Sequence, residues 1–229
     1  MSLDVYVMPL CRFKAGDVRT ASQRALGRLA HIVNPFGLIS PKRIKRLEAM
    51  KQGRAATAKL LAEAESMLGV PLHWADRGDV VFAEQASWGF QALQAYAKWL
   101  DLQDVFPTFG DPPDNNFYNH PAMLWSEHPR AFRFSHLIDH CCHTGYFVPC
   151  RFDRVVMVEP FESWGGRVFH HSFGSSFTLA DQLEAMRVHL PARQDVSEAA
   201  HDWIHGGFNL LRTTASKSIE HQLPIIFWG

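Results

Sequence analysis

The spacing of apolar residues along the chain follows two periods, one typical of strands and the other of helices. The N-terminal stretch "LDVYVMPL" places Leu3, Val5 and Val7 opposite Asp4 and Tyr6, the alternation of a half-buried strand. Short apolar runs predict further strands in "GYFVP", "CRFDRVVMVEP", "GRVFHHSFG" and "PIIFWG". Apolar residues three and four positions apart predict helices over residues 17–32, 41–68, 81–100, 129–143, 175–190 and from Asp195 or Ser197 to about Ile219.

The helix over 41–68 has the clearest limits. Ser40 is a favourable N-cap, Pro41 suits the first helical position, and Gly69 suits the residue after the last turn. The spacing of its apolar residues predicts a buried stripe made of Ile44, Leu47, Ala58, Leu61 and Leu68.

These elements predict an α+β fold, in which a predominantly helical single domain over residues 1–229 contains a small, mostly antiparallel sheet. Hydrophobic residues make up 47% of the chain, which is enough for one large core, and no linker-like composition divides it. Residues 101–128 differ, because four prolines and five aromatic residues predict a long, irregular, aromatic-rich loop. Loops of this length often carry function.

Net charge is zero, but the charge is unevenly distributed. Residues 12–59 form a basic helical segment with twelve Lys/Arg and two acidic residues, a net +10, so the remainder carries −10. Two interpretations stay open: the basic helices pack against the acidic remainder, above all residues 60–114, or they face a charged partner. Six residues are expected to contact a partner. Four lie on the helix over 41–68, namely Lys42, Arg43, Lys45 and Arg46, and two lie on the loop, namely Phe117 and Tyr118.

The histidine-rich stretch "SHLIDHCCHTGYFVPC" is a candidate metal site. On one helix, His136, His140 and His143 would share a side, and Cys150 could return from the next strand. Such a site would bind zinc or another divalent metal, with Asp139 orienting one ligand. The alternative is that the stretch is a helix end followed by a strand, in which case no cofactor is expected.

A second histidine pair occurs in "HDWIHGG", where His201 and His205 have the spacing of the zinc-binding H-E-x-x-H helix. Asp202 occupies the position that glutamate takes in that motif, and its shorter side chain would lie further from a zinc-bound water. No third ligand follows, so the pair is a weaker metal candidate than the first stretch.

Composition and termini indicate the compartment. The sequence has no apolar run long enough to span a bilayer, and its N-terminus does not have the pattern of a signal peptide. Two of the four cysteines, Cys141 and Cys142, are adjacent, which does not suit a disulfide framework. We therefore expect a cytoplasmic protein with reduced thiols and no membrane contact.

Four stretches together resemble a known group of proteins: "MSLDVYV", "SWGFQALQAYAKWL", "LIDHCCHTGYFVP" and "FGSSFTLADQLEAM". Their order is similar to that of a loose group of uncharacterised bacterial cytosolic proteins with a domain of unknown function. The resemblance covers about half of the chain. It implies a bacterial single-domain protein, and it implies no activity and no catalytic residue.

The sequence is compatible with three functions. The leading hypothesis is a binding protein without catalytic activity that neutralises a protein partner, as toxin-immunity proteins do. The first alternative is a metal-dependent hydrolase built on His136 and His140. The second is nucleic-acid binding through the basic helices, whose affinity would fall steeply with salt.

Overall fold

The computed structural model describes residues 3–19, 41–74, 76–86, 88–112, 114, 116–126, 131–141, 144–162 and 168–228. The strands are β1 (Leu3–Val7), β2 (Phe82–Ala86), β3 (Thr144–Val148), β4 (Val156–Glu162), β5 (Val168–Ser175) and β6 (Ile225–Trp228). The helices are α1 (Leu10–Lys14), α3 (Pro41–Leu68), α4 (Gly89–Leu100), α5 (Pro121–Leu124), α6 (Ser135–Ile138), α7 (Ser176–Met186) and α8 (Glu198–His221), with the 3-10 turns η1 (Phe117–Asn119) and η2 (Arg187–His189).

A six-stranded sheet in the order β2-β1-β6-β3-β5-β4 forms the middle layer of the molecule. β3 and β5 pair in parallel, and the other neighbouring strands pair antiparallel, which confirms the predicted α+β class and mostly antiparallel sheet. The C-terminal strand β6 lies between β1 and β3, so both ends of the chain meet in the centre of the sheet.

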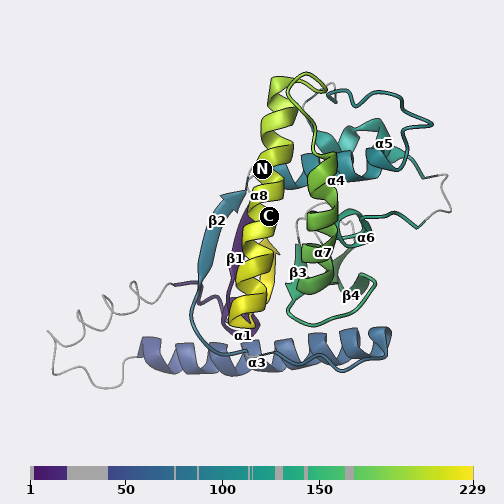
Figure 1. Cartoon of the computed structure of the whole chain (residues 1–229). Helices are drawn as coiled ribbons and strands as arrows, with labels where there is room; N and C mark the ends of the chain where they lie inside the picture. Colours follow the sequence, from purple (N-terminus) through teal and green to yellow (C-terminus); the bar gives the residue numbers. More distant parts are fainter. Residues whose placement is uncertain are drawn as a thin grey trace, which may run out of the picture.

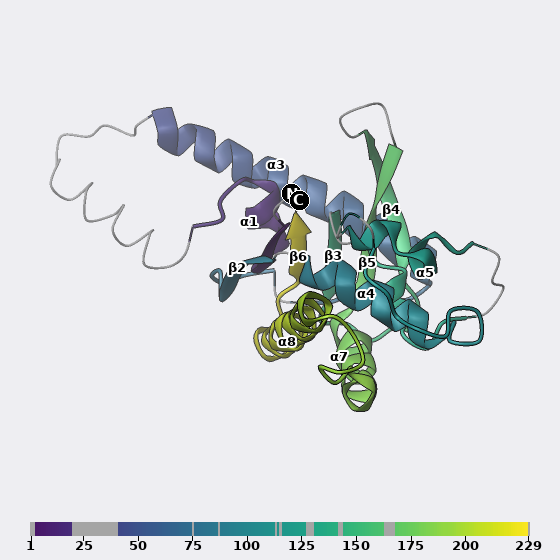
Figure 2. The same cartoon turned by 90° about the horizontal axis from the view of Figure 1, so that it is seen from above.

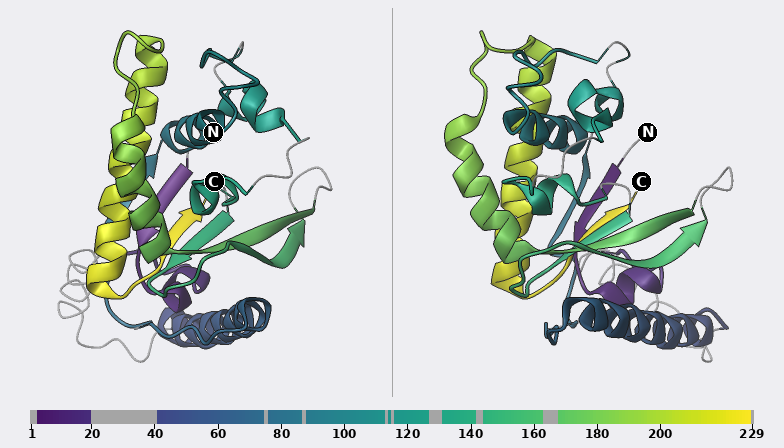
Figure 3. Two further views of the ribbon diagram at one scale, coloured as in Figure 1. Left: turned by 45° about the vertical axis from the view of Figure 1, so that its right-hand side comes forward. Right: turned by 90° about the vertical axis from the view of Figure 1, so that its right-hand side faces the viewer.

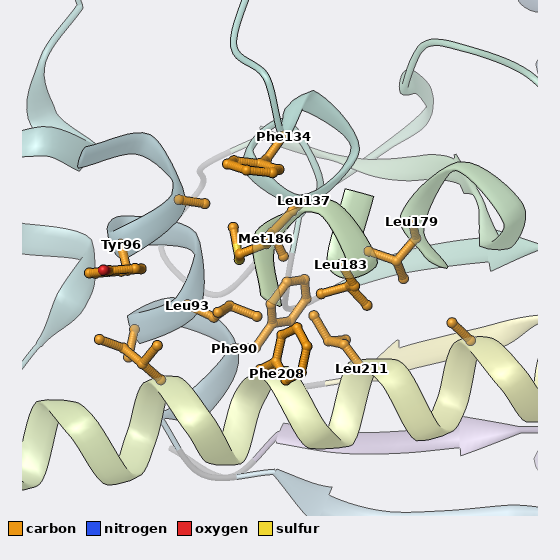
Figure 4. Close-up of a cluster of buried hydrophobic side chains, with 14 of the residues drawn as sticks. Phe90, Leu93, Tyr96, Phe134, Leu137, Leu179, Leu183, Met186, Phe208 and Leu211 are labelled. Carbon is orange, nitrogen blue, oxygen red and sulfur yellow. The ribbon is translucent and has the colours of Figure 1, made fainter. Parts of the chain in front are cut away.

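Helices cover both faces of this sheet (Figures 1 and 2). The alternation along β1 sends Leu3, Val5 and Val7 into the larger core, which α4, α7 and α8 complete. Figure 4 shows this cluster of side chains between the three helices. On the opposite face, α1 and α3 cover a second cluster that includes Met8, Leu60 and further side chains of the sheet.

The buried face of α3 differs from the stripe that its apolar residues predict. Its limits, Pro41 and Leu68, are as predicted. However, Leu47 is 64% exposed, whereas Gly53 is buried. The backbone of α1 lies so close to Gly53 that a Cβ there would overlap the carbonyl oxygen of Cys11. α3 therefore packs on α1 through a small residue, and much of its charged surface is left in solvent.

Three predicted helices need correction or lie outside the described residues. The segment 81–100 is strand β2 followed by helix α4, because β2 extends the sheet beside β1. The helix predicted over 129–143 is reduced to the short α6, and α1 was not predicted. Most of the helix predicted over 17–32 falls on residues 20–40, outside the described part of the chain.

Candidate functional site

The ring of His140 is buried, and its two nitrogens face backbone carbonyl oxygens and no metal site among the described residues. Nδ1 lies 3.1 Å from the carbonyl oxygen of Cys141, and Nε2 lies 3.2 Å from that of Tyr146. The ring stacks on Phe147 at 3.8 Å between ring centres. Burial lowers the pKa of His140 to about 3, so the ring is neutral and structural at neutral pH.

The other members of the predicted cluster do not converge on His140. His136 is also buried, its nitrogens have no hydrogen-bond partner among the described residues, and burial lowers its pKa to about 4. The thiol of Cys150 donates to the carbonyl oxygen of His73 at 3.3 Å and packs with the core cluster under α3. His143 lies outside the described residues. Because α6 ends at Ile138, His136 and His140 do not lie on one continuous helix, as the prediction assumed.

His201 and His205 lie together on α8, with ring centres 4.2 Å apart. His201 Nδ1 contacts the carboxylate of Asp202 at 3.1 Å, and His205 Nε2 contacts the carbonyl oxygen of Pro191 at 3.0 Å. Within the described residues, no group of three or more His, Cys, Asp or Glu side chains could hold a metal ion. The described residues therefore provide no metal site for the hydrolase interpretation.

The loop residues expected to contact a partner are mainly core residues. Phe117 is fully buried with its ring against Trp203, at 5.6 Å between ring centres, so the prediction was wrong for this residue. Tyr118 is half-buried, and its hydroxyl accepts a hydrogen bond from Gln91 at 3.4 Å. The predicted basic residues lie far from this loop, in the first turns of α3 (Figure 1): Lys42, Arg43, Lys45 and Arg46.

An acidic surface that was not predicted lies where α8 begins. We call it the acidic pole and define it as the exposed carboxylates of Asp111, Asp114, Asp195, Glu198 and Asp202. The two segments that supply them, 111–116 and 193–202, contain a single basic residue, Arg193. It pairs with Glu198 at 3.7 Å, with both side chains largely exposed, so it offsets little of this charge.

One hydrogen bond joins the two acidic segments, and two more order the loop segment itself. The hydroxyl of Ser197, the N-cap of α8, donates to the carboxylate of Asp111 at 2.8 Å. Asp114 accepts hydrogen bonds from the backbone of Asn116 and the side chain of Asn119, which lower the pKa of its carboxyl group. The carboxylates of the loop are thus tied in place beside those of the helix.

Aromatic packing beneath the acidic pole fixes the shape of the loop. Phe109 lies against Tyr96 and Trp99 of α4, with ring centres 5.2 and 5.7 Å away. On its other side Phe109 stacks on His120 at 4.4 Å. The indole nitrogen of Trp99 also donates to the carbonyl oxygen of Phe106 at 2.8 Å. The loop predicted to be irregular and aromatic-rich is therefore an ordered support for the acidic pole.

The acidic pole and the basic helix α3 lie at opposite ends of α8 (Figures 1 and 3). α8 has 24 residues and is therefore about 36 Å long. Just after its C-terminal end, Pro224 accepts a hydrogen bond from Met8, next to α1, on which α3 packs. At physiological salt, charges are screened over about 8 Å, so α3 does not neutralise the acidic pole.

The acidic residues 60–114 are divided between the two ends of the molecule. Close to α1, Asp79 contacts Arg12 at 3.5 Å and Asp76 accepts from the backbone of Cys11. Asp111 and Asp114, by contrast, belong to the acidic pole. The ion pair between Arg12 and Asp79 therefore shows that the basic segment and residues 60–114 neutralise each other in part near α1.

Comparisons with known proteins assign the chain to a family. No curated protein and no solved structure matches it. A family model described as "Putative DNA-mimic protein" matches residues 1–227, almost the whole chain, and thus extends the partial resemblance to an uncharacterised group. This match overturns the toxin-immunity interpretation, because it indicates a partner that binds DNA. The chain belongs to this DNA-mimic family.

Proposed function

We propose that this protein binds a DNA-binding protein and offers it the acidic pole in place of the DNA backbone. The observation that carries the proposal is the concentration of Asp111, Asp114, Asp195, Glu198 and Asp202 at one end of an electrically neutral chain. DNA-binding surfaces attract phosphates largely through lysine and arginine side chains, and such surfaces attract clustered carboxylates by the same force.

Separation of charge explains how a chain of zero net charge can act as an anion. The field at a surface depends on the charges within a few screening lengths, and the bases of α3 lie well beyond that range. A DNA-binding protein that approaches the start of α8 therefore meets a negative surface. The basic end of the molecule has little effect on this encounter.

The packing beneath the acidic pole also favours tight binding. A loop that is already ordered by Phe109 and by the Ser197–Asp111 hydrogen bond loses little conformational entropy when a partner binds. Glu198 lies in the first turn of α8, where the positive end of the helix dipole attracts a negative side chain. Both features favour a fixed arrangement of the negative groups.

Reversing two charges of the acidic pole should abolish partner binding. The variant E198K/D202K replaces two exposed carboxylates with lysines, so we expect affinity for the partner to fall by on the order of a hundredfold or more. The measurement uses DNA-binding proteins of the host cell, enriched on immobilised duplex DNA and then passed over the immobilised protein. A true target is retained, is released by free duplex DNA, and loses its own DNA complex when the wild-type chain is added.

The matched control is D181K/E184K, which makes the same change of charge at two exposed positions of α7. Among the described residues, these two side chains pair with Arg151 and Arg187 at the surface, so folding should be unaffected. We expect this control to retain the target as the wild type does. Equal loss in both variants would show that only overall charge matters. Passage of every DNA-binding protein without retention would refute the proposed function.

A further inference from the structure

The basic helix α3 presents a second charged surface, which the proposed function does not use. Between residues 41 and 59 it carries seven Lys/Arg and one acidic residue, a net +6. Lys45, Lys51, Arg54 and Lys59 are exposed on it. Lys45 and Lys51 form no ion pair with any residue that the structure describes. A cationic face of this kind needs an anionic partner or stays solvated.

The required anionic surface is present on the chain itself, but out of reach within one molecule. The acidic pole lies beyond the far end of α8, about 36 Å away by the length of that helix. The two surfaces have opposite sign: the five carboxylates of the acidic pole and Arg193 sum to −4, and residues 41–59 sum to +6. Only a second copy of the chain can bring them together.

We propose that the protein associates head to tail with itself, the basic face of α3 of one copy docking on the acidic pole of the next. The contact joins two different surfaces, so it is heterologous and leaves one free acidic pole and one free basic face in every complex. Association is therefore open-ended, and it strengthens as salt is lowered because screening weakens.

Head-to-tail association would also regulate the DNA-mimic surface. A copy whose acidic pole is covered by α3 of a neighbour cannot offer that pole to a DNA-binding protein. A target with a stronger positive surface would displace the neighbour and release single copies. This consequence rests on the proposed function, whereas the association itself does not.

Sedimentation of the full-length protein without any partner tests the association. At about 10 mM ionic strength the average mass should rise with concentration above 26.0 kDa, and at about 0.3 M it should return to that of the monomer. The variants K45E/K51E and E198K/D202K should each remain mostly monomeric at low salt, because the first lowers the net charge of residues 41–59 from +6 to +2 and the second brings the acidic pole, counted with Arg193, from −4 to 0. Their self-association should weaken by on the order of tenfold or more.

Mixing the two variants provides the decisive measurement. The acidic pole of K45E/K51E fits α3 of E198K/D202K, so the mixture should associate although neither variant does so alone. The control D181K/E184K should associate as the wild type does. A wild type that stays monomeric at low salt, or a mixture that stays monomeric, would overturn the proposal. Because no DNA-binding protein is present, either result is independent of the proposed function.

Discussion

Replacing Gly207 with alanine should destabilise the protein by about 3 kcal/mol or more. Of the substitutions that add a single methyl group, we expect this one to be the most destabilising. A Cβ at this position would overlap the carbonyl oxygen of Gly89, and it would lie 2.5 Å from the carbonyl carbon of the same residue. These are backbone atoms, so no side chain can move aside. The helices α4 and α8 would have to separate, and the core between them, including Phe90 and Phe208, would lose contacts (Figure 4).

The neighbouring residue provides a control with the opposite expected sign. A Cβ on Gly206 would have no atom within 4 Å outside its own helix, and the residue is exposed in the interior of α8. Alanine there removes the backbone freedom of glycine in the unfolded chain, which should stabilise the protein by up to about 1 kcal/mol. Urea denaturation of both variants checks the pair. Equal midpoints would mean that α4 and α8 do not cross at this point.

Lowering the pH from 7 to 5 should cost about 4 kcal/mol of folding free energy, about 2 kcal/mol from each of the two buried histidines. Burial lowers the pKa of His136 to about 4 and that of His140 to about 3. The unfolded chain takes up protons at these sites below about pH 6.5, whereas the folded chain does not. Stability is therefore complete above pH 6.5 and is lost progressively as the pH falls towards 4.

Replacing His136 with leucine isolates one of these two contributions. Its ring makes no hydrogen bond with the described residues and lies 5.9 Å from the ring of Phe152, so an apolar side chain fits its surroundings. We expect H136L to be at least as stable as the wild type at pH 7, and to lose about 2 kcal/mol less on going to pH 5. Urea midpoints at both pH values provide the test. The same pH dependence in both proteins would show that His136 titrates normally.

Several features of the fold could be predicted because they depend on neighbours in the sequence. The alternation in "LDVYV" and the apolar run in "PIIFW" predict β1 and β6, whichever strands they pair with. Pro41 and Gly69 delimit α3 through local backbone geometry alone. The charge imbalance of residues 12–59 is likewise a property of the sequence. It predicts a charged surface but not where the opposite charge lies.

The candidate site could not be predicted in the same way. Its acidic residues come from two segments about 80 positions apart, and each segment alone is an ordinary solvated stretch. One local signal was available, because residues 101–114 contain four acidic residues and no basic one. That signal does not reveal the Ser197–Asp111 hydrogen bond, which joins the loop to α8.

The sequence by itself determined the fold class, the limits of α3, and a total charge of zero with a basic segment near the N-terminus. Only the tertiary structure decided that His136 and His140 are buried, with no metal site among the described residues, and that Phe117 belongs to the core. It also decided that the acidic pole and α3 lie a helix length apart. The reason is physical: periodicity reports neighbours along the chain, whereas burial and electric field depend on distances between segments that only folding brings together.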